Sequence, residues 1–391
     1  MERLRGPEIL AQLETERERL IRFLRELVEA ESPSSVPETQ RRVRSVLATA
    51  LEELGFHTQP LHGRRTGGHL YARPRHRRRG TGVQLLIGHY DTVWPVGTLA
   101  GRPFEVDGNV IRGPGVFDMK GGLAQIVFAL GALRALGLEP ALTPVIFVNA
   151  DEEIGSRDSG RHVRRLARIA RRAFVLEPSM GADGRLKTAR KGVGRYTVTV
   201  HGRAAHAGLD PEGGVSAILE LSHVIQKLFA LNDAERGVTV NVGTVDGGMR
   251  PNVIAPLSQA VIDVRVPTAS DAERVDEAIM SLAPETPGVR IRTEGGFGRP
   301  ALERTRRNRT LWEAARSHGA ALGLDLGEAR AGGGSDGNTT SLYTATLDGL
   351  GPVGDGAHAE HEFLYLDRTL ERTALLGSLL LAPDIAGGGE A

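Results

Sequence analysis

The sequence contains no cysteine, which excludes a disulfide framework and a thiolate metal site. Any metal ion must therefore be held by histidine, aspartate and glutamate side chains. No apolar run approaches the roughly 20 residues that a membrane helix needs, so we expect no membrane partner. The opening residues, MERLRGPEILAQLETERERL, lack the apolar core and small-residue cleavage site of a secretory signal, which favours a cytoplasmic location.

The chain also lacks an excess of either charge, because 49 Lys and Arg residues face 48 Asp and Glu residues. Its one dense basic run, RPRHRRR at 73–79, is the single feature that a basic RNA-associated protein would use. No aromatic residues interleave with this run to stack on bases. We interpret it as a solvated loop between two strands and expect no nucleic-acid partner.

Apolar patterning indicates two domains, as the length of 391 residues suggests. Short and almost wholly apolar runs at 83–88, 145–150 and 173–177 are typical of buried parallel strands. From about residue 191 the order becomes β-α-β-β-α-β, a self-contained unit. We therefore predict a doubly wound, mostly parallel α/β domain interrupted by an inserted α+β domain, with boundaries at 1–190, 191–303 and 304–391. The helices expected before the first strand lie at 8–29 and 38–54.

Acidic and histidine side chains follow the ends of the predicted parallel strands, where open α/β sheets place their ligand crevice. They are His89, Asp91, Asp118, Asp151, Glu152, Glu153 and Glu177. Taken singly, such a residue is more often a loop hydrogen-bond partner or a helix cap. Together, these carboxylates would repel one another unless a cation balanced them. The sequence therefore predicts a metal centre at this edge of the sheet.

The motifs GHYDTV, GVFDMKGG, DEEIGS, EPS and HGRAAHAG, in this order, resemble the two-zinc aminoacylase and carboxypeptidase family called peptidase family M20. The resemblance covers nearly the whole chain. It implies two Zn²⁺ per chain, with Co²⁺ or Mn²⁺ as alternatives, because these ligand types accept all three ions. The implied ligands are His89, Asp118, Glu153, Glu177 and His358. Asp118 would bridge the two ions, and its peptide bond to Met119 is often cis in the family.

The resemblance also implies roles in catalysis. Glu152 would be the general base, taking a proton from the metal-activated water and passing it to the leaving amine. Asp91 would accept the second ring N–H of His89 and fix its tautomer. His206 would stabilise the tetrahedral oxyanion in the partner subunit of a homodimer formed through the inserted domain.

Five further residues are candidates for substrate binding. Arg299 matches a residue that, in the folate-cleaving branch of the resembled family, binds the free carboxylate of the substrate. A guanidinium is suited to this task. Asn252 and Arg265 match substrate-contacting positions, although Arg265 can instead pair with a neighbouring acid. Ser335 and Asp336 lie in AGGGSDGN, which lacks the ending of a phosphate loop and is interpreted as a substrate wall. Asp336 is alternatively a helix cap.

The resemblance implies metal-dependent hydrolysis of an amide bond in a small peptide or N-acyl amino acid with a free carboxylate. The GRPAL and GGGSD segments favour glutamate carboxypeptidase activity, as in the folate-cleaving branch of the family. Acetylornithine deacetylase, succinyl-diaminopimelate desuccinylase and aminoacylase activities share the same constellation. A catalytically silent amino-acid-binding module is the non-enzymatic alternative, although every family ligand position is filled.

Two histidines in GDGAHAEHEF compete for the last ligand position. In the family this ligand follows a Gly-rich turn and has an acid four residues on, followed by an aromatic residue. His358, with Glu362 and Phe363, fits that pattern. We expect His361 to be a surface residue or one that only supports the centre.

Overall fold

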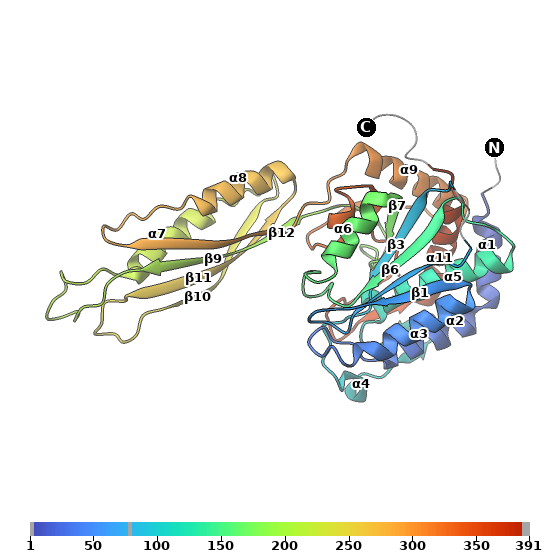
Figure 1. Ribbon diagram of the computed structural model, residues 1–391, viewed down its shortest axis with the longest axis horizontal. Coiled ribbons are helices and arrows are strands. Elements are labelled where there is room, and N and C mark those ends of the chain that lie inside the picture. Colours follow the sequence, from blue (N-terminus) through green and yellow to red (C-terminus); the bar gives the residue numbers. More distant parts are fainter. Residues whose placement is uncertain (1–3, 77–79, 385–391) are drawn as a thin grey trace. The chain divides into compact units, whose positions relative to one another are not determined.

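The computed structural model describes residues 4–76 and 80–384, and the chain divides into two compact units (Figure 1). The main unit runs to Thr188 and resumes at Arg304, apart from a short segment. The inserted unit comprises Ala189–Glu303 and that segment, Gly332–Gly334. Arg77, Arg78 and Arg79 of the predicted basic loop lie outside the described residues.

A six-stranded sheet forms the centre of the main unit, in the order β1-β2-β6-β3-β7-β14. Its strands are β1 (Phe56–Leu61), β2 (His69–Pro74), β6 (Thr143–Asn149), β3 (Val83–His89), β7 (Ala170–Val175) and β14 (Ala345–Leu347). β3 pairs in parallel with both β6 and β7, and β7 pairs in parallel with β14. β2 runs antiparallel to both of its neighbours, β1 and β6. The prediction of a mostly parallel sheet is confirmed.

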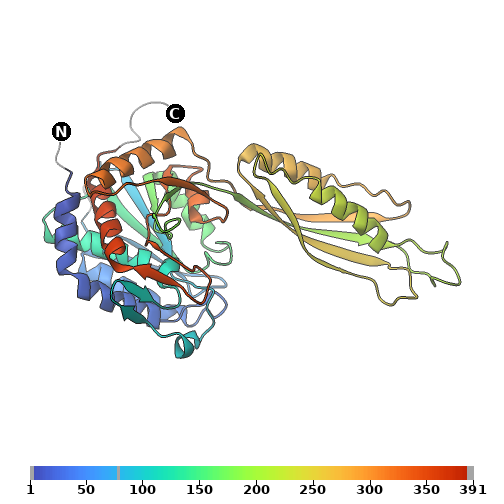
Figure 2. The ribbon, with the colours of Figure 1, turned by 180° about the vertical axis from the view of Figure 1, so that it is seen from behind.

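Helices cover both faces of this sheet, as a doubly wound fold requires. Alternate residues of β3 face opposite sides: Leu86 joins one apolar core, whereas Leu85 and Ile87 join another with α6 (Gly160–Ile169). The first core is covered by five long helices, which lie together in Figures 1 and 2. They are α1 (Gly6–Thr15), α2 (Arg17–Glu29), α3 (Gln40–Glu53), α5 (Gly121–Ala135) and α11 (Leu366–Leu381). α9 (Arg306–Ala320) adds to the same core, and α10 (Asp336–Thr340) packs on α6.

Two sequence expectations for helices are corrected. The single helix expected at 8–29 is broken at Glu16, where the chain turns so that Leu13 of α1 and Leu20 of α2 are both fully buried. The segment Val116–Ala135 is long and apolar enough to cross a membrane, so the longest apolar run is greater than expected. Of its most apolar 18-residue window, 89% is buried inside the protein, as is typical of a core helix.

Smaller elements at the edge of the main unit carry two loops of interest. A four-stranded sheet has the order β15-β16-β5-β4, with β15 (Gly354–Asp355), β16 (Phe363–Tyr365), β5 (Val110–Arg112) and β4 (Glu105–Asp107). β5 leads into the π turn η1 (Val116–Lys120), and β15 and β16 enclose the loop that carries His358. The remaining elements are α4 (Thr98–Gly101), β8 (Leu186–Arg190) and β13 (Glu328–Ala331), and the last two pair with each other.

The inserted unit has the predicted β-α-β-β-α-β order. Its elements are β9 (Gly192–His201), α7 (Ala217–Phe229), β10 (Thr239–Gly247), β11 (Leu257–Val266), α8 (Ala269–Met280) and β12 (Arg290–Arg299). The sheet is antiparallel throughout, in the order β10-β11-β9-β12. Val198 and Val200 of β9 point to the face that α7 and α8 cover, where they join Val224 and Ile279 in a separate core. The unit thus has the independent core of a domain.

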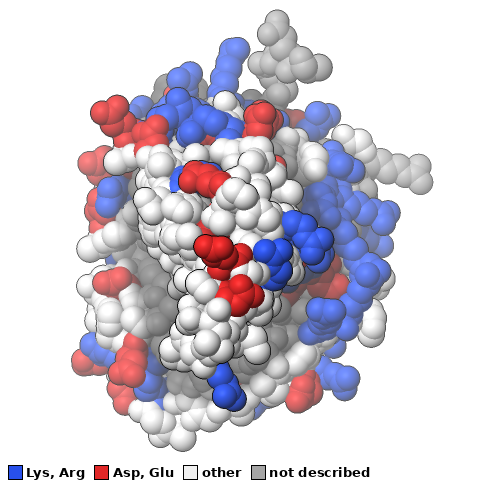
Figure 3. Space-filling view, turned by 90° about the vertical axis from the view of Figure 1, so that its left-hand side faces the viewer, with Lys and Arg blue, Asp and Glu red and all other residues white. Residues whose placement is uncertain are grey.

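The described surface mixes both charges. Figure 3 shows acidic and basic side chains interspersed with uncharged ones, with basic side chains more frequent along the right-hand margin. This distribution agrees with the near balance of charges in the sequence.

Candidate metal centre

The residues predicted as metal ligands lie together at the carboxyl ends of the parallel strands. His89 ends β3, while Glu153 follows β6 and Glu177 follows β7. Asp118 lies in the π turn η1, and His358 lies between β15 and β16. Because β6, β3 and β7 are neighbours that run in the same direction, their ends meet at one edge of the sheet.

Asp118 lies between the two histidines. Its Oδ1 is 3.3 Å from Nε2 of His89, and its Oδ2 is 3.5 Å from Nε2 of His358. Each histidine also approaches a second carboxylate: His89 Nε2 is 3.4 Å from Glu177 Oε1, and His358 Nε2 is 3.0 Å from Glu153 Oε2. The centre therefore has two halves. One half contains His89 and Glu177, the other contains His358 and Glu153, and both halves share Asp118.

The unsatisfied atoms of the centre fit a cation. His89 Nε2, Asp118 Oδ1 and Glu153 Oε1 are buried without a hydrogen-bond partner among the described residues. An unsatisfied buried polar atom costs about 1–3 kcal/mol, so three in one place indicate a missing partner. Ligand atoms of His89, Asp118 and Glu153 lie within 4.8 Å of one another, as do those of His89, Glu152 and Glu177. Imidazole and carboxylate donors without thiolate suit Zn²⁺, Co²⁺ and Mn²⁺.

The crowded charges shift the pKa values of the ligands. Burial opposes protonation of His89, but the nearby carboxylates of Asp118, Asp91 and Glu177 raise its pKa well above the ordinary value. The hydrogen bond with Glu153 raises the pKa of His358 to about 9. Burial raises the pKa of Glu153 to about 7. The close approach of these groups that shifts their pKa values is the crowding of negative charge that a cation would balance.

Asp91 holds the turn that carries Glu152 and Glu153. Its buried carboxylate accepts the backbone N–H of Glu152 at 3.1 Å and that of Glu153 at 3.2 Å, and the hydroxyl of Ser34 at 2.6 Å. The ring of His89 lies nearer to the backbone carbonyl of Asp91, with Nδ1 at 2.9 Å, than to its carboxylate at 3.5 Å. The expected contact with the ring is therefore made chiefly by the carbonyl, because the carboxylate oxygens face two backbone N–H groups.

Ser335 and Asp336 are buried inside the main unit. The hydroxyl of Ser335 caps α10 by accepting the N–H of Gly337 at 3.0 Å, so Ser335 is the cap and Asp336 is not. The Asp336 carboxylate accepts the amide of Asn149 and, at 2.6 Å, the hydroxyl of Ser156. Asp336 thus supports the turn after β6, whereas Ser335 holds the start of α10, and their contact with substrate stays a prediction.

Comparison with known proteins agrees with this geometry. Residues 188–288 match the family model described as the M20 peptidase dimerisation domain. The chain is 29% identical over 315 residues to carboxypeptidase G2 from Pseudomonas sp. (strain RS-16). The matched region covers 79% of this chain and 75% of the relative. These matches make the chain similar to peptidases of family M20, and they support a metal-dependent hydrolase.

Other similar proteins carry the names of different activities. Acetylornithine deacetylase from Myxococcus xanthus is 31% identical over 234 residues, covering 56% of this chain and 57% of the relative. The fold is similar to that of aminopeptidase PepT from Bacillus cereus, with a TM-score of 0.76, 21% identity and coverage of 95% and 99% of the two chains. It is also similar to YXEP from Bacillus subtilis, a dinuclear metal-binding M20 peptidase, with a TM-score of 0.67, 17% identity and coverage of 94% and 98%. The peptide bond between Asp118 and Met119 is cis, as the family resemblance suggested.

Four of the predicted residues belong to the inserted unit. His206 is exposed, and its Nδ1 accepts the backbone N–H groups of Gly208 at 3.2 Å and Leu209 at 3.1 Å. A ring nitrogen that accepts two hydrogen bonds carries no proton, so Nε2 carries it. The exposed Asn252 lies on a loop that contacts the His206 loop, since its carbonyl accepts the N–H of Ala207 at 3.0 Å.

The two arginines of the inserted unit differ in their surroundings. Arg265 pairs with Asp263 through two hydrogen bonds, of 2.7 Å and 3.1 Å, as the alternative interpretation of the sequence allowed. Arg299 is the last residue of β12, where a bulge between Phe297 and Arg299 interrupts the pairing with β9. No shift of register affects Arg265 in its pairing with β9.

Sequence reasoning missed the role of Glu362, which served only as a landmark for His358. Its buried carboxylate accepts four N–H groups, three of them from the turn that carries Asp118. The only signal in the sequence was its fixed spacing from His358. His361 is exposed, unlike Glu362, and no group of ligand atoms within 4.8 Å in the described part of the chain includes it.

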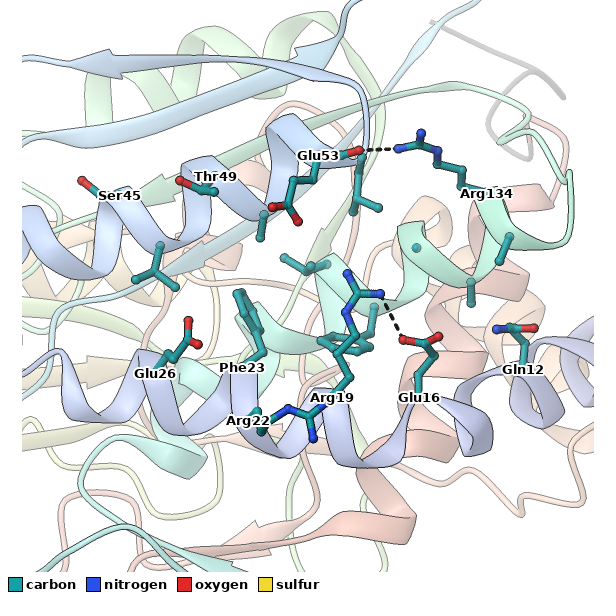
Figure 4. A pocket seen from close by; sticks show the side chains of 18 residues that line it. Gln12, Glu16, Arg19, Arg22, Phe23, Glu26, Ser45, Thr49, Glu53 and Arg134 are labelled. Carbon is teal, nitrogen blue, oxygen red and sulfur yellow. Dashed lines mark hydrogen bonds and ion pairs between the residues drawn. The ribbon is translucent and has the colours of Figure 1, made fainter.

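A groove of about 850 Å³ lies elsewhere on the main unit, between α2, α3 and α5 (Figure 4). Phe23 and Phe128 form part of its floor, and charged side chains line its rim. Two of the arginines there have partners: Arg19 bonds to Glu16, and Arg134 donates to the backbone carbonyl of Glu53. The groove includes none of the clustered ligands, so its size alone does not make it the active site.

Proposed function

We propose that this protein is an M20 peptidase that uses two zinc ions to hydrolyse an amide bond in a small peptide or N-acyl amino acid with a free carboxylate. One observation carries the proposal: the two oxygens of Asp118 face different histidines, at 3.3 Å and 3.5 Å. A carboxylate so placed suits a bridge between two metal ions. The similarity in fold to a dinuclear metal-binding M20 peptidase supports the same number of ions.

The ligand atoms divide between two sites. His89 and Glu177 would hold the first ion, and Glu153 and His358 the second, with Asp118 shared. Ions bound there would lower the pKa of a bound water and polarise the carbonyl of the substrate. The chain's own residues then have to orient the substrate and transfer the proton.

Glu152 is the proposed general base. It is 9% exposed, and a carboxylate oxygen lies within 4.8 Å of ligand atoms of His89 and Glu177. Its backbone N–H is held by the Asp91 carboxylate at 3.1 Å, which keeps the side chain at the centre. From this position Glu152 takes a proton from the attacking water and donates it to the leaving amine.

The inserted unit supplies the proposed substrate contacts and the dimer. The match to an M20 dimerisation domain at 188–288 supports a homodimer formed through this unit. We assign the substrate carboxylate to Arg299, because a guanidinium binds a carboxylate through two parallel hydrogen bonds. His206 has its proton on Nε2, so it is suited to donate a hydrogen bond to the oxyanion of the tetrahedral intermediate.

Glutamate carboxypeptidase activity is the proposed specificity. The similarity to carboxypeptidase G2 spans 79% of the chain, whereas that to acetylornithine deacetylase spans 56%. A turnover screen of the zinc-loaded protein separates these activities. The substrates are dipeptides with C-terminal glutamate, matched dipeptides with other C-terminal residues, and N-acyl amino acids including acetylornithine.

The test of the mechanism is Glu152→Gln, which keeps the shape of the side chain and removes the base. We expect two zinc ions per chain by elemental analysis and a loss of turnover of about 10²–10⁴-fold. Glu105→Gln, on exposed β4, is the matched control and should keep both zinc and turnover. Undiminished turnover in Glu152→Gln would show that another group is the base. A wild-type protein without metal would refute the dinuclear mechanism itself.

A further inference from the structure

One buried carboxylate connects the two loops that carry Asp118 and His358. Glu362 is 1% exposed and lies four residues after His358. Its Oε1 accepts the backbone N–H groups of Phe117 and Asp118, each at 3.0 Å. Its Oε2 accepts the backbone N–H of Gly115 and the indole N–H of Trp94, each at 2.8 Å.

These four hydrogen bonds use the full capacity of an ionised carboxylate, which has about four acceptor positions and no proton to donate. A glutamine has one acceptor oxygen, and its NH₂ group would face two of the four donors. A shorter aspartate keeps the charge but loses reach. The arrangement is therefore specific for glutamate in its ionised form.

The turn that carries Asp118 does not hold itself in place by regular helical hydrogen bonds. Gly115 has a φ of 75°, and Asp118 and Met119 depart from helical dihedral angles. In such a turn the backbone N–H groups need outside acceptors. Glu362 supplies the acceptor for three of them, including the N–H of the proposed bridging ligand itself.

The same residue is attached to the loop of His358 by a short path. The N–H of Glu362 donates to the carbonyl of Ala359 at 3.1 Å, and the N–H of Ala359 donates to Gly356 at 2.8 Å. His358 lies inside this tight loop with a φ of 61°. A shift of Glu362 would therefore move both the Asp118 turn and the His358 loop.

We propose that Glu362 is a positioning residue that sets the separation of Asp118 and His358, and so the geometry of the second metal site. The inference rests on the proposed dinuclear centre, and it deepens that proposal by adding a residue that touches neither ion. Supporting groups of this kind around metal ligands typically change metal affinity by about 10–100-fold when they are removed.

The test compares Glu362→Gln with Glu360→Gln in the full chain. Glu360 is exposed and lies in the same loop, so its variant removes one charge from the same segment. Metal-free protein is titrated with Co²⁺, and the visible absorption spectrum is followed to saturation. Equilibrium dialysis against Zn²⁺ then gives the two affinities. Far-UV circular dichroism of the metal-free proteins checks that each variant is folded.

We expect Glu362→Gln to bind the second ion about 10–100-fold more weakly and to have an altered cobalt spectrum at saturation. Glu360→Gln should match the wild type in both. A role confined to stability would leave the saturated spectrum unchanged, and that result would overturn the inference. If Glu362→Gln fails to fold, Glu362→Asp gives the same readout, and a spectrum and affinity like those of the wild type would again overturn it.

The wild-type titration separates this inference from the proposed function. Two ions bound by the wild type and by Glu362→Gln with equal affinity and spectrum would leave the dinuclear centre intact and remove Glu362 from its support. Absence of cobalt binding by the wild type would refute the proposed function, and the inference with it.

Discussion

Replacing Asp91 by asparagine is the sharpest test of how the centre is held. The Asp91 side chain is fully buried, and its two oxygens accept three donors: Oδ1 accepts the N–H of Glu152, while Oδ2 accepts the N–H of Glu153 and the hydroxyl of Ser34. An asparagine has one acceptor oxygen and one NH₂ group. Whichever way it is oriented, its NH₂ group faces at least one donor.

The expected loss follows from those contacts. With the oxygen toward Glu153 and Ser34, the N–H of Glu152 becomes an unsatisfied buried donor, at about 1–3 kcal/mol. The hydrogen bonds from the Glu153 N–H and the Ser34 hydroxyl would then go to a neutral amide oxygen instead of a charged carboxylate. This change costs about 1 kcal/mol for each bond. We therefore expect Asp91→Asn to lower the free energy of unfolding of the metal-free protein by about 3–5 kcal/mol.

The assay is urea unfolding of the full chain with a chelator present, followed by far-UV circular dichroism. Ser34→Ala removes only one of the three donors and should lose about 1 kcal/mol. Asp107→Asn, at an exposed position of β4, is the matched control and should unfold as the wild type does. An unfolding midpoint of Asp91→Asn equal to that of Asp107→Asn would refute the assignment of Asp91 as the support of the Glu152–Glu153 turn.

Two further predictions concern other parts of the chain. His358→Ala should lose one zinc ion per chain by elemental analysis, because it removes a ligand atom 3.0 Å from Glu153, whereas the exposed His361→Ala should keep both. In the inserted unit, Glu220 is buried, and its carboxylate accepts the backbone N–H of Thr286 at 2.7 Å. Burial opposes ionisation of Glu220, but this hydrogen bond and others lower its pKa below the ordinary value. Its stabilisation, about 1–2 kcal/mol relative to Glu220→Gln, should be complete above the ordinary glutamate pKa and disappear as the pH falls through the lower folded pKa. Thermal unfolding of both proteins from neutral to acidic pH measures this difference, and a constant difference at all pH values would contradict it.

The strand-end residues of the centre were predictable from the sequence. The runs before His89, Glu152 and Glu177 are almost wholly apolar because β3, β6 and β7 are buried on both faces, and polar residues directly after such strands have to meet at one edge. Neither spacing nor periodicity could relate Asp118 to His358, which lie far apart in the chain. That assignment depended on the family resemblance.

The supporting contacts were not predictable, because they join distant segments through backbone groups. Glu362 reaches N–H groups 244 or more residues away, and backbone N–H groups leave no mark in the sequence. The break at Glu16 was missed for a similar reason. It contains neither proline nor glycine, and it follows from how Leu13 and Leu20 pack in the core.

The inserted unit begins and ends at neighbouring points of the chain. Arg190 and Leu302 exchange two backbone hydrogen bonds, of 2.9 Å and 3.0 Å, so the chain leaves the unit beside the place where it entered. For the sheet of the main unit, the insertion is therefore a loop whose two ends are held together by these hydrogen bonds. The entropic cost of closing a loop rises by only about 0.6 kcal/mol for each doubling of its length. The unit can therefore change in length or surface, and with it the proposed dimer and substrate contacts, at little cost to the stability of the sheet that carries the proposed metal ligands.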